Sequence, residues 1–371
     1  MENFLYSKEL SSIKKSNRFR TRELFDENLI DLASNDYLGL SIKKEIFQKA
    51  YERVLKENYH SPKASMLVNG YSKIHKQFED KLCELNKFEA AVTVGSGFLA
   101  NISMIEALCR KNDTIFIDEE YHASGILASK LLKPEQVIIF NHNDCNDLKA
   151  KILNNKRTGR ILIAIEGVYS MGGDLAPIEI FNLADEYKAI LIVDEAHSSG
   201  VIGENLLGIF DYYKITPNKY HIKMGTLGKA YGSYGAYILA SQEIIDFLVN
   251  RAKPIIYSTA PSLFDTALGY ESLKFIIKNK KELKKRIEEN LNIIYKELGI
   301  KSQSLIIPIL IGDNKKAKEI QGILKEHGYL VGAIRQPTVK EAIIRLIAKI
   351  DIQSDVLTNI CKLLKEFNVN K

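Results

Sequence analysis

Residues 190–200 read ILIVDEAHSSG, and this stretch decides the fold. The run Ile190–Val193 is apolar and of strand length, as expected for a strand of a parallel sheet that is covered on both faces. An Asp-Glu-Ala-His sequence, which ends at His197, follows this run and begins the next loop. That tetrapeptide is a signature of ATP-driven helicase motors, and it also occurs in unrelated proteins. The residues around it have to show whether this protein is a helicase motor or belongs to an unrelated class.

The motor interpretation requires a phosphate-binding loop of the form G-x-x-x-x-G-K-[ST]. The chain has a single Gly-Lys pair, Gly228-Lys229, which is followed by Ala230, and Lys223 stands where the first glycine should be. The pair also follows the acidic strand, whereas a phosphate-binding loop precedes it. A DEAH-type ATPase is therefore only a remote alternative.

Strand-like runs alternate with longer amphipathic segments from about residue 90 onward. This rhythm is typical of an α/β fold with a mostly parallel central sheet flanked by helices. The strand-like runs are AAVTVG (90–95), TIFID (114–118), QVIIF (136–140), RILIAIEG (160–167), AILIV (189–193), HIKMG (221–225) and YGAYILA (234–240).

Polar or glycine-rich residues follow five of these strands. Ligands of such sheets bind beyond the carboxyl ends of the strands, so these residues should gather at one rim. They are Gly95–Phe98, Tyr121–His122, Tyr169–Ser170, Asp194 with His197, and Thr226–Lys229.

The sequence predicts three parts: an N-terminal segment (1–40), a large domain (41–252) and a smaller α+β C-terminal domain (253–371). The last part is expected to begin with a helix at FDTALGYESLKFII (264–277), followed by two more helices. The strands SLIIPILI, YLVGAI and IIRLIAKI and a final helix, VLTNICKLLKEF, come after them.

Composition excludes several classes of function. The formal net charge is only +6, and acids alternate with bases in the densest basic run, so a nucleic-acid partner is not expected. Apolar residues at helical spacing in that run, Leu283, Ile287, Leu291 and Ile294, indicate a solvated helix instead. No apolar run is long enough to span a bilayer, and the N-terminus lacks a secretory signal, which favours the cytoplasm. Four dispersed cysteines without a C-x-x-C pair argue against a zinc site, and no metal is expected.

The rim residues fit pyridoxal 5'-phosphate (PLP) chemistry. Lys229 could form a Schiff base with an aldehyde cofactor once its pKa is lowered. Asp194 could keep the ring nitrogen protonated, so that the ring accepts electrons from a carbanion.

The remaining rim residues suit the other parts of the same cofactor. His197 could donate to the phenolic oxygen and His122 could stack on the ring. The phosphate requires amides at a helix N-terminus together with a hydroxyl, which Gly97, Phe98 and Thr226 could supply.

The chain resembles the α-oxoamine synthases, fold-type I PLP enzymes that condense an amino acid with an acyl thioester and release carbon dioxide. The resemblance covers nearly the whole chain from about Leu32. The motifs that carry it are SNDYLGL (34–40), VNGYSKIHKQFEDKL (68–82), GSGFLANI (95–102), YHASG (121–125), EGVYSMGGDLAPI (166–178), VDEAHSSGVIGE (193–204), TLGKAYGSYGA (226–236), IIYSTA (255–260) and AIRQPTV (333–339).

The resemblance implies roles for individual residues. The cofactor-binding set is Gly97, Phe98, His122, Ser170, Asp194, His197, Thr226 and Lys229, joined by Ser258 and Thr259 from a neighbouring subunit, which implies a homodimer. The catalytic set is Lys229, His122 and Asp194. The substrate-binding set is Asn35, His122, Thr338, Arg345 and one N-terminal arginine, for which Arg18 is preferred over Arg20 and Arg22.

The stretch HSPKASMLVNGYSKIH (60–75), the triplet His142–Asp144 and VGAIRQPTV (331–339) favour the family member that joins L-alanine to a pimeloyl thioester in biotin biosynthesis. A glycine-using relative, such as glycine C-acetyltransferase, is the alternative. The acyl carrier stays open between coenzyme A and acyl carrier protein. Glu195 departs from the family, which usually has a second aspartate there.

Overall fold

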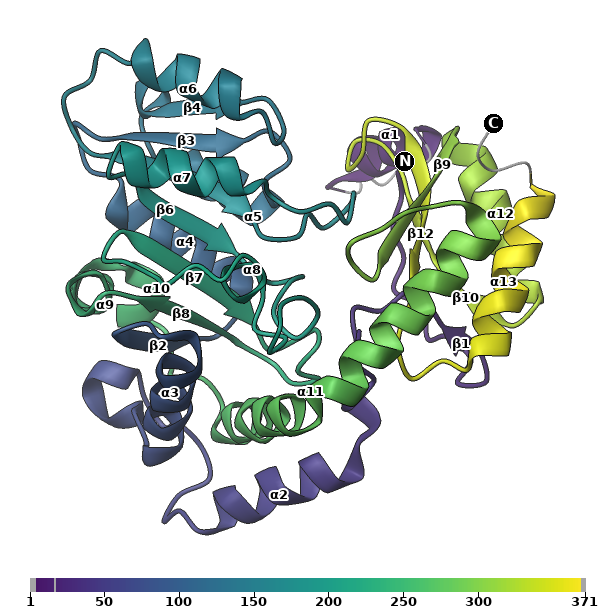
Figure 1. Ribbon diagram of the computed structural model, residues 1–371, viewed down its shortest axis with the longest axis horizontal. Coiled ribbons are helices and arrows are strands. Elements are labelled where there is room, and N and C mark those ends of the chain that lie inside the picture. Colours follow the sequence, from purple (N-terminus) through teal and green to yellow (C-terminus); the bar gives the residue numbers. More distant parts are fainter. Residues whose placement is uncertain (1–4, 17, 368–371) are drawn as a thin grey trace.

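A seven-stranded sheet forms the centre of the larger part of the molecule in the computed structural model, which describes residues 5–16 and 18–367 (Figure 1). The strand order is β2-β8-β7-β6-β5-β3-β4, and β8 alone runs antiparallel to its neighbours. The predicted α/β fold with a mostly parallel sheet is therefore confirmed. The strands are β2 (Ala90–Val94), β3 (Thr114–Asp118), β4 (Val137–Phe140), β5 (Ile161–Glu166), β6 (Ile190–Asp194), β7 (His221–Thr226) and β8 (Ala236–Ala240).

The strands are apolar on both faces because each face contacts its own core. In β6, Leu191 and Val193 join one hydrophobic cluster, whereas Ile190 and Ile192 join the other. Alternation of this kind explains why the strand sequence is a continuous apolar run. The helices of this part are α3 (Lys73–Asn86), α4 (Gly97–Leu108), α5 (Ala123–Ser129), α6 (Cys145–Leu153), α7 (Ile178–Glu186), α8 (Ile209–Tyr212), α9 (Gln242–Arg251) and α10 (Lys253–Ile256).

A three-stranded antiparallel sheet, ordered β11-β12-β9, forms the centre of the C-terminal part. Its strands are β9 (Ile306–Gly312), β11 (Gly332–Ile334) and β12 (Ala342–Ile347), and its helices are α12 (Asn314–Glu326) and α13 (Ser354–Glu366). The short strand β1 (Ile30–Asp31) pairs in parallel with β10 (Tyr329–Leu330). The N-terminal segment is therefore attached to the C-terminal part.

One long helix, α11 (Leu263–Leu298), runs between the two parts (Figure 1). It contacts α2 (Lys44–Leu55) and α3 as well as α13. The prediction of several separate helices in this stretch was wrong, because the helix continues for 36 residues until Gly299 ends it in a left-handed conformation. The predicted apolar face is confirmed, since Leu283, Ile287 and Ile294 are buried.

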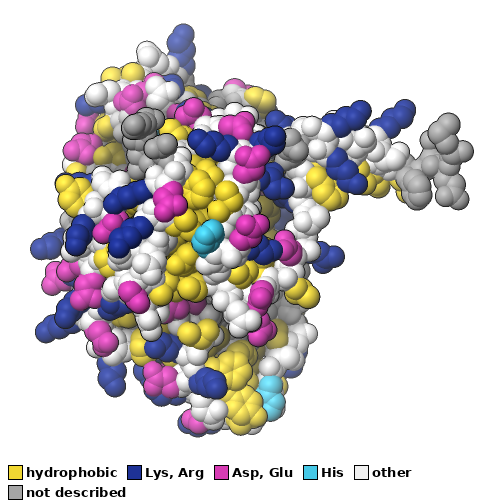
Figure 2. Space-filling view, turned by 90° about the vertical axis from the view of Figure 1, so that its right-hand side faces the viewer, with side chains coloured by type: hydrophobic (Ala, Val, Ile, Leu, Met, Phe, Trp, Pro, Cys, Tyr) yellow, Lys and Arg dark blue, Asp and Glu magenta, His cyan; other side chains and the backbone are white. Residues whose placement is uncertain are grey.

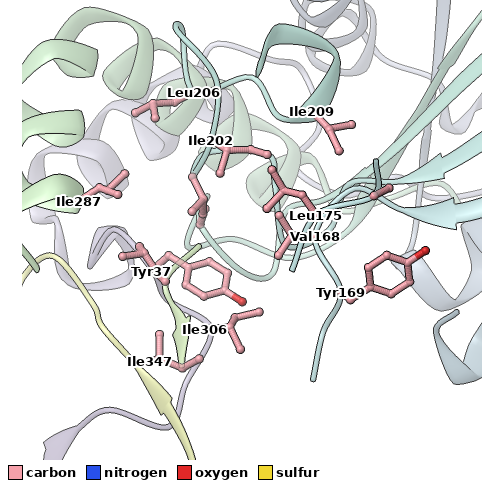
Figure 3. Packing of buried hydrophobic residues seen from close by; sticks show 14 of the residues in the cluster. Tyr37, Val168, Tyr169, Leu175, Ile202, Leu206, Ile209, Ile287, Ile306 and Ile347 are labelled. Carbon is pink, nitrogen blue, oxygen red and sulfur yellow. The ribbon is translucent and has the colours of Figure 1, made fainter. Parts of the chain in front are cut away.

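The two parts share a continuous core. Figure 3 shows Tyr37 beside Ile306 and Ile347 of the C-terminal strands, with Val168 and Leu175 of the large part nearby. Tyr37 is 1% exposed, so the N-terminal segment inserts a whole aromatic ring between the two sheets. A shared core of this kind can hold residues from both parts in one site.

Helix α1 (Ser7–Lys15) buries none of its residues and extends away from the body (Figure 2). Within the described ranges, no helix is both long and apolar enough to cross a membrane. The remaining short helical turns are η1 (Leu40–Ile42), η2 (Met66–Gly70) and η3 (Pro134–Gln136).

Glu195 forms a buried ion pair. Its carboxylate accepts a bond from the amide of Ile209 (2.6 Å) and lies 3.6 Å from the ammonium of Lys223. Both side chains are at most 1% exposed, and the Lys223 ammonium also donates to Asn86 Oδ1 (2.8 Å). Glu195 therefore belongs to the structural core behind the rim.

We expect Lys223→Met to lower the free energy of unfolding by about 3 kcal/mol, because it leaves the Glu195 carboxylate buried without its counter-charge. Urea unfolding followed by circular dichroism measures the change. The exposed Lys219 supplies the control, since Lys219→Met should change stability by less than about 0.5 kcal/mol. Equal midpoints for the two variants would contradict a stabilising role for the pair.

Candidate active site

The carboxyl ends of the parallel strands bring the predicted rim residues to one edge of the sheet. His122 follows β3, Ser170 follows β5, and Asp194 ends β6. Thr226 ends β7, and Lys229 lies in the turn that follows it. The turn exists because β8 returns antiparallel, with Thr226 paired to Ala236.

Lys229 is bound to His197 at the centre of this rim. Its Nζ lies 2.7 Å from His197 Nε2, and His197 Nδ1 lies 2.5 Å from the hydroxyl of Tyr37. His197 thus connects Lys229 to the N-terminal segment. Its pKa is well below the usual range, first because it is buried and then because Lys229 and Arg345 add positive charge nearby.

Burial also lowers the pKa of Lys229 to about 8, although the charges of Asp194 and Glu166 oppose the shift. A lysine with this pKa is partly neutral near physiological pH, and the neutral amine is the nucleophilic and basic form. Lys229 therefore has the protonation behaviour that covalent catalysis and proton abstraction require.

Asp194 is buried and bound on both carboxylate oxygens. Oδ1 accepts from the amide of Ala196 (3.0 Å), and Oδ2 accepts from Asn101 Nδ2 (2.8 Å). Glu166 is its partner in the β5–β6 register, and its pKa is well above the usual value because it is buried and lies near the Asp194 charge. One oxygen of Glu166, Oε1, is buried without a hydrogen-bond partner within the described chain.

The N-terminus of α4 lies next to the end of β7. Ser96 caps the helix by accepting from the amide of Leu99, and Gly97 is its first residue. A β-carbon at Gly97 would lie 3.9 Å from the β-carbon of Thr226. Unpaired amides at a helix start attract anions. Gly97, Phe98 and Thr226 therefore form a suitable phosphate cradle, and Phe98 is 46% exposed beside it.

Arg345 on β12 reaches this rim from the C-terminal part. Its Nε donates to the carbonyl of Ser170 (2.8 Å), and both terminal nitrogens donate to Asn35 Oδ1 (3.1 Å each). The residue is 6% exposed, yet no carboxylate in residues 5–16 or 18–367 forms a salt bridge with it. A buried cation without a counter-ion is costly, so this position is suited to bind an anion from outside the chain.

A cleft of about 850 Å³ opens beside these residues. His122 and Ser170 line it from the large part, and Thr338 and Ile343 line it from the C-terminal part. Its wall is mostly apolar, with Ile126, Leu127, Met171, Pro308, Pro337 and Val339 among the lining residues. An acyl chain would fit such a wall.

The predicted residues that do not line this cleft include Arg18, Ser258 and Thr259. Arg18 is exposed in the segment between α1 and β1, as are Arg20 and Arg22. Ser258 and Thr259 lie in a separate small hollow beside Gly95. Their predicted role, contacting a neighbouring subunit's cofactor, stays a prediction.

His142 bridges two of the loops that form the rim by hydrogen bonds to both. Its Nδ1 lies 2.9 Å from Asp118 Oδ1 at the end of β3, and its Nε2 lies 2.8 Å from Asp174 Oδ2. The ring also packs edge-on against Tyr169, at 4.4 Å between centroids. Burial alone would lower the pKa of His142, but the two carboxylates outweigh it and raise the pKa to about 10.

We expect His142→Gln to lower the free energy of unfolding by about 2 kcal/mol at pH 6, a charged-hydrogen-bond value discounted for partial exposure. Because the folded pKa is raised, the contribution is complete below the unfolded pKa of about 6.5 and disappears as pH rises toward about 10. Thermal unfolding of both proteins between pH 6 and 10 tests this. The control is His60→Gln at an exposed histidine, for which the change in unfolding free energy should not depend on pH. If the stability difference between wild type and His142→Gln stayed the same from pH 6 to 10, the prediction would be contradicted.

Three buried polar residues of the site were not assigned a role from the sequence. Tyr37 binds His197, Asn101 binds Asp194, and Glu166 is paired with Asp194 in the register of β5 and β6. All three occur inside motifs that the sequence analysis noted, SNDYLGL, GSGFLANI and EGVYSMGGDLAPI. The motifs alone do not say which of their members face the site.

The residues at this rim fit PLP. The donor set offers a lysine of lowered pKa, a buried carboxylate and an anion cradle, and the unpartnered oxygen of Glu166 leaves a hydrogen-bonding position open. Lys229 would hold the aldehyde carbon, Asp194 the ring nitrogen, and the start of α4 with Thr226 the phosphate.

Comparisons with known proteins show which family and which solved structures the chain is similar to. The family model for aminotransferase class I and II matches residues 27–363. An 8-amino-7-oxononanoate synthase from Helicobacter pylori (strain J99) is 48% identical over 343 residues, which cover 92% of each chain. The crystal structure of 8-amino-7-oxononanoate synthase from Francisella tularensis is 26% identical, with a TM-score of 0.73, and the match covers 93% of this chain and all of that one.

Serine palmitoyltransferase from S. paucimobilis, solved with a bound PLP–myriocin aldimine, has a TM-score of 0.88 at 20% identity. That match covers 99% of this chain and 98% of the other. At this identity it supports the fold alone.

Proposed function

The chain belongs to the class I and II aminotransferases and, within them, to the PLP-dependent 8-amino-7-oxononanoate synthases, and on that premise we propose that it condenses L-alanine with a pimeloyl thioester. The products are 8-amino-7-oxononanoate, carbon dioxide and the free thiol of the carrier, and the step belongs to biotin biosynthesis. The observation that carries the proposal is the buried Arg345, held by Asn35 and Ser170 near Lys229, which suits an amino-acid carboxylate.

The cofactor and the site residues have different roles in the proposed reaction. PLP, when bound, supplies an electron-accepting ring that stabilises negative charge at the substrate α-carbon. Lys229 Nζ takes the α-proton, because its lowered pKa leaves part of it neutral. Arg345 and Asn35 orient the amino-acid carboxylate. His122 lies at the cleft wall, where the acyl thioester enters.

The apolar cleft supports an acyl chain as second substrate. Its walls come from α5, the loop after β5 and the C-terminal part, so the acyl chain would lie between the two parts. Thr338 lies at the same wall and is our candidate contact to the acyl substrate. Enclosure by both parts would also exclude water from the carbanion.

We further propose a cytoplasmic homodimer. Ser258 and Thr259 lie beside the glycine-rich turn after β2, where a second subunit's cofactor could be contacted. Large apolar side chains nearby are exposed in the single chain, among them Leu67, Val68 and Tyr257. Free thiols at all four cysteines suit a reducing compartment.

The substrate assignment is tested by the release of free thiol. We expect L-alanine with pimeloyl-CoA or pimeloyl-acyl carrier protein to exceed glycine with acetyl-CoA at least about tenfold in kcat/KM, because one methyl group contributes about 1–3 kcal/mol. Comparing the two pimeloyl carriers identifies the natural one. Preference for glycine and acetyl-CoA would instead identify a glycine C-acetyltransferase.

A further inference from the structure

A continuous hydrogen-bond relay joins His122 to Asp194 through buried residues. His122 Nδ1 lies 2.6 Å from Ser124 Oγ, and Asn101 Nδ2 donates to the same Oγ (2.9 Å). Asn101 Nδ2 also donates to Asp194 Oδ2 (2.8 Å), and Tyr121 donates from its hydroxyl to Asn101 Oδ1 (2.6 Å). Asn101, Ser124 and Tyr121 are at most 3% exposed, so water does not compete for these contacts.

The position of every hydrogen in this relay follows from counting donors and acceptors. The two amide hydrogens of Asn101 go to Ser124 and to Asp194, and its carbonyl accepts from Tyr121. The amide cannot be reversed, because its oxygen would then face the Asp194 carboxylate. The Asp194 charge therefore fixes the orientation of Asn101.

Ser124 passes this orientation on to His122. Within the described residues its Oγ bonds to Asn101 Nδ2, which is a donor, and to His122 Nδ1, so Nδ1 is the acceptor available to its single hydroxyl hydrogen. The backbone amide of Ser124 also donates to Nδ1 (3.3 Å). With two donors directed at it, Nδ1 carries no proton. The proton of the neutral ring is then on Nε2, for which no hydrogen bond exists within the described residues.

We propose that Asn101 and Ser124 are positioning residues that hold His122 in the tautomer with a bare Nδ1, so that Nε2–H donates to a carboxylate or carbonyl oxygen of a substrate in the cleft. The relay ends at Asp194. The same carboxylate would therefore contact the ring nitrogen of PLP and, through Asn101 and Ser124, keep the proton of His122 on Nε2. Burial also lowers the pKa of His122, which keeps the ring neutral. The substrate part of this inference rests on the proposed function.

The test is ¹⁵N NMR of the PLP-loaded enzyme with ¹⁵N-labelled histidine and no substrate, because protonated and bare ring nitrogens differ widely in chemical shift. The His122 signals are identified by their loss in His122→Asn. We expect Nδ1 bare and Nε2 protonated from pH 6 to 8, and a protonated Nδ1 would overturn the proposal. The NMR measurement needs no turnover. Its result therefore decides the tautomer of His122 even if the enzyme does not accept L-alanine and a pimeloyl thioester.

Ser124→Ala provides the second test. We expect a mixture of tautomers and a decrease of about tenfold in kcat/KM for the acyl thioester, the value of one hydrogen bond. Cofactor content should stay unchanged. Ser129→Ala is the matched control, since Ser129 is a buried serine of the same helix whose hydroxyl bonds only to the carbonyl of Ile126. An unchanged tautomer in Ser124→Ala would overturn the proposal, and the wild-type spectrum decides it if that variant does not fold.

Discussion

Replacing Lys229 with alanine will lower kcat by about 10⁴-fold or more, the upper end of what a positioned general base contributes. The loss should be this large because the same Nζ would also hold the cofactor. His197, which is hydrogen-bonded to this Nζ, would replace it poorly, since its pKa is well below the usual range and it therefore accepts protons poorly. Thiol release from pimeloyl-CoA with saturating L-alanine measures the effect.

Borohydride treatment of the PLP-loaded enzyme, followed by peptide mapping, checks the covalent part of this prediction. The wild-type protein should be modified at Lys229, and Lys229→Ala should not be modified. Lys149→Ala, at an exposed lysine of α6, should keep full activity and labelling. Labelling of another lysine, such as the buried Lys223, would remove Lys229 from its role.

The rim of the sheet could be predicted from the sequence because strand ends are local features. Each strand is a short apolar run, and the polar residue that matters follows it within a few positions, as Asp194 follows Val193. The parallel topology then brings His122, Ser170 and Lys229 to one edge. No contact distant in sequence was needed for this step.

Contacts between distant segments could not be predicted in the same way. Tyr37 and His197 are 160 positions apart, and Arg345 and Asn35 are 310 apart. Their meeting depends on how the C-terminal part packs against the large sheet, which no local pattern encodes. Asn35 and Arg345 were expected only from family resemblance, and the role of Tyr37 was not predicted.

The length of α11 was missed for a related reason. Its sequence changes from the apolar segment near Leu273 to the charged segment near Lys285, which resembles a helix boundary. The helix continues because its two halves contact different parts of the molecule, α2 and α3 with one half and α13 with the other. Tertiary packing therefore decides the continuity of this helix.

Asp194→Asn will slow the exchange of the α-hydrogen of L-alanine with solvent deuterium by about 10³-fold, as expected when a preorganised charge is removed from a buried site. Asparagine keeps the volume but has no negative charge to stabilise a protonated ring nitrogen. It also places an NH₂ group opposite either Asn101 Nδ2 or the amide of Ala196, both of which donate to Asp194. Mass spectrometry of recovered alanine measures the exchange.

The size of this effect separates an electrostatic role of Asp194 from a purely structural one. Asp113→Asn is the matched control, because Asp113 is also buried and bound to Arg160 but precedes β3, at the opposite edge of the sheet. That variant should lose stability and keep its exchange rate. Asp194→Asn should retain borohydride labelling at Lys229 while exchange collapses, because the covalent link does not depend on the ring nitrogen. Normal exchange in Asp194→Asn would mean that the ring does not need a charged partner at this position.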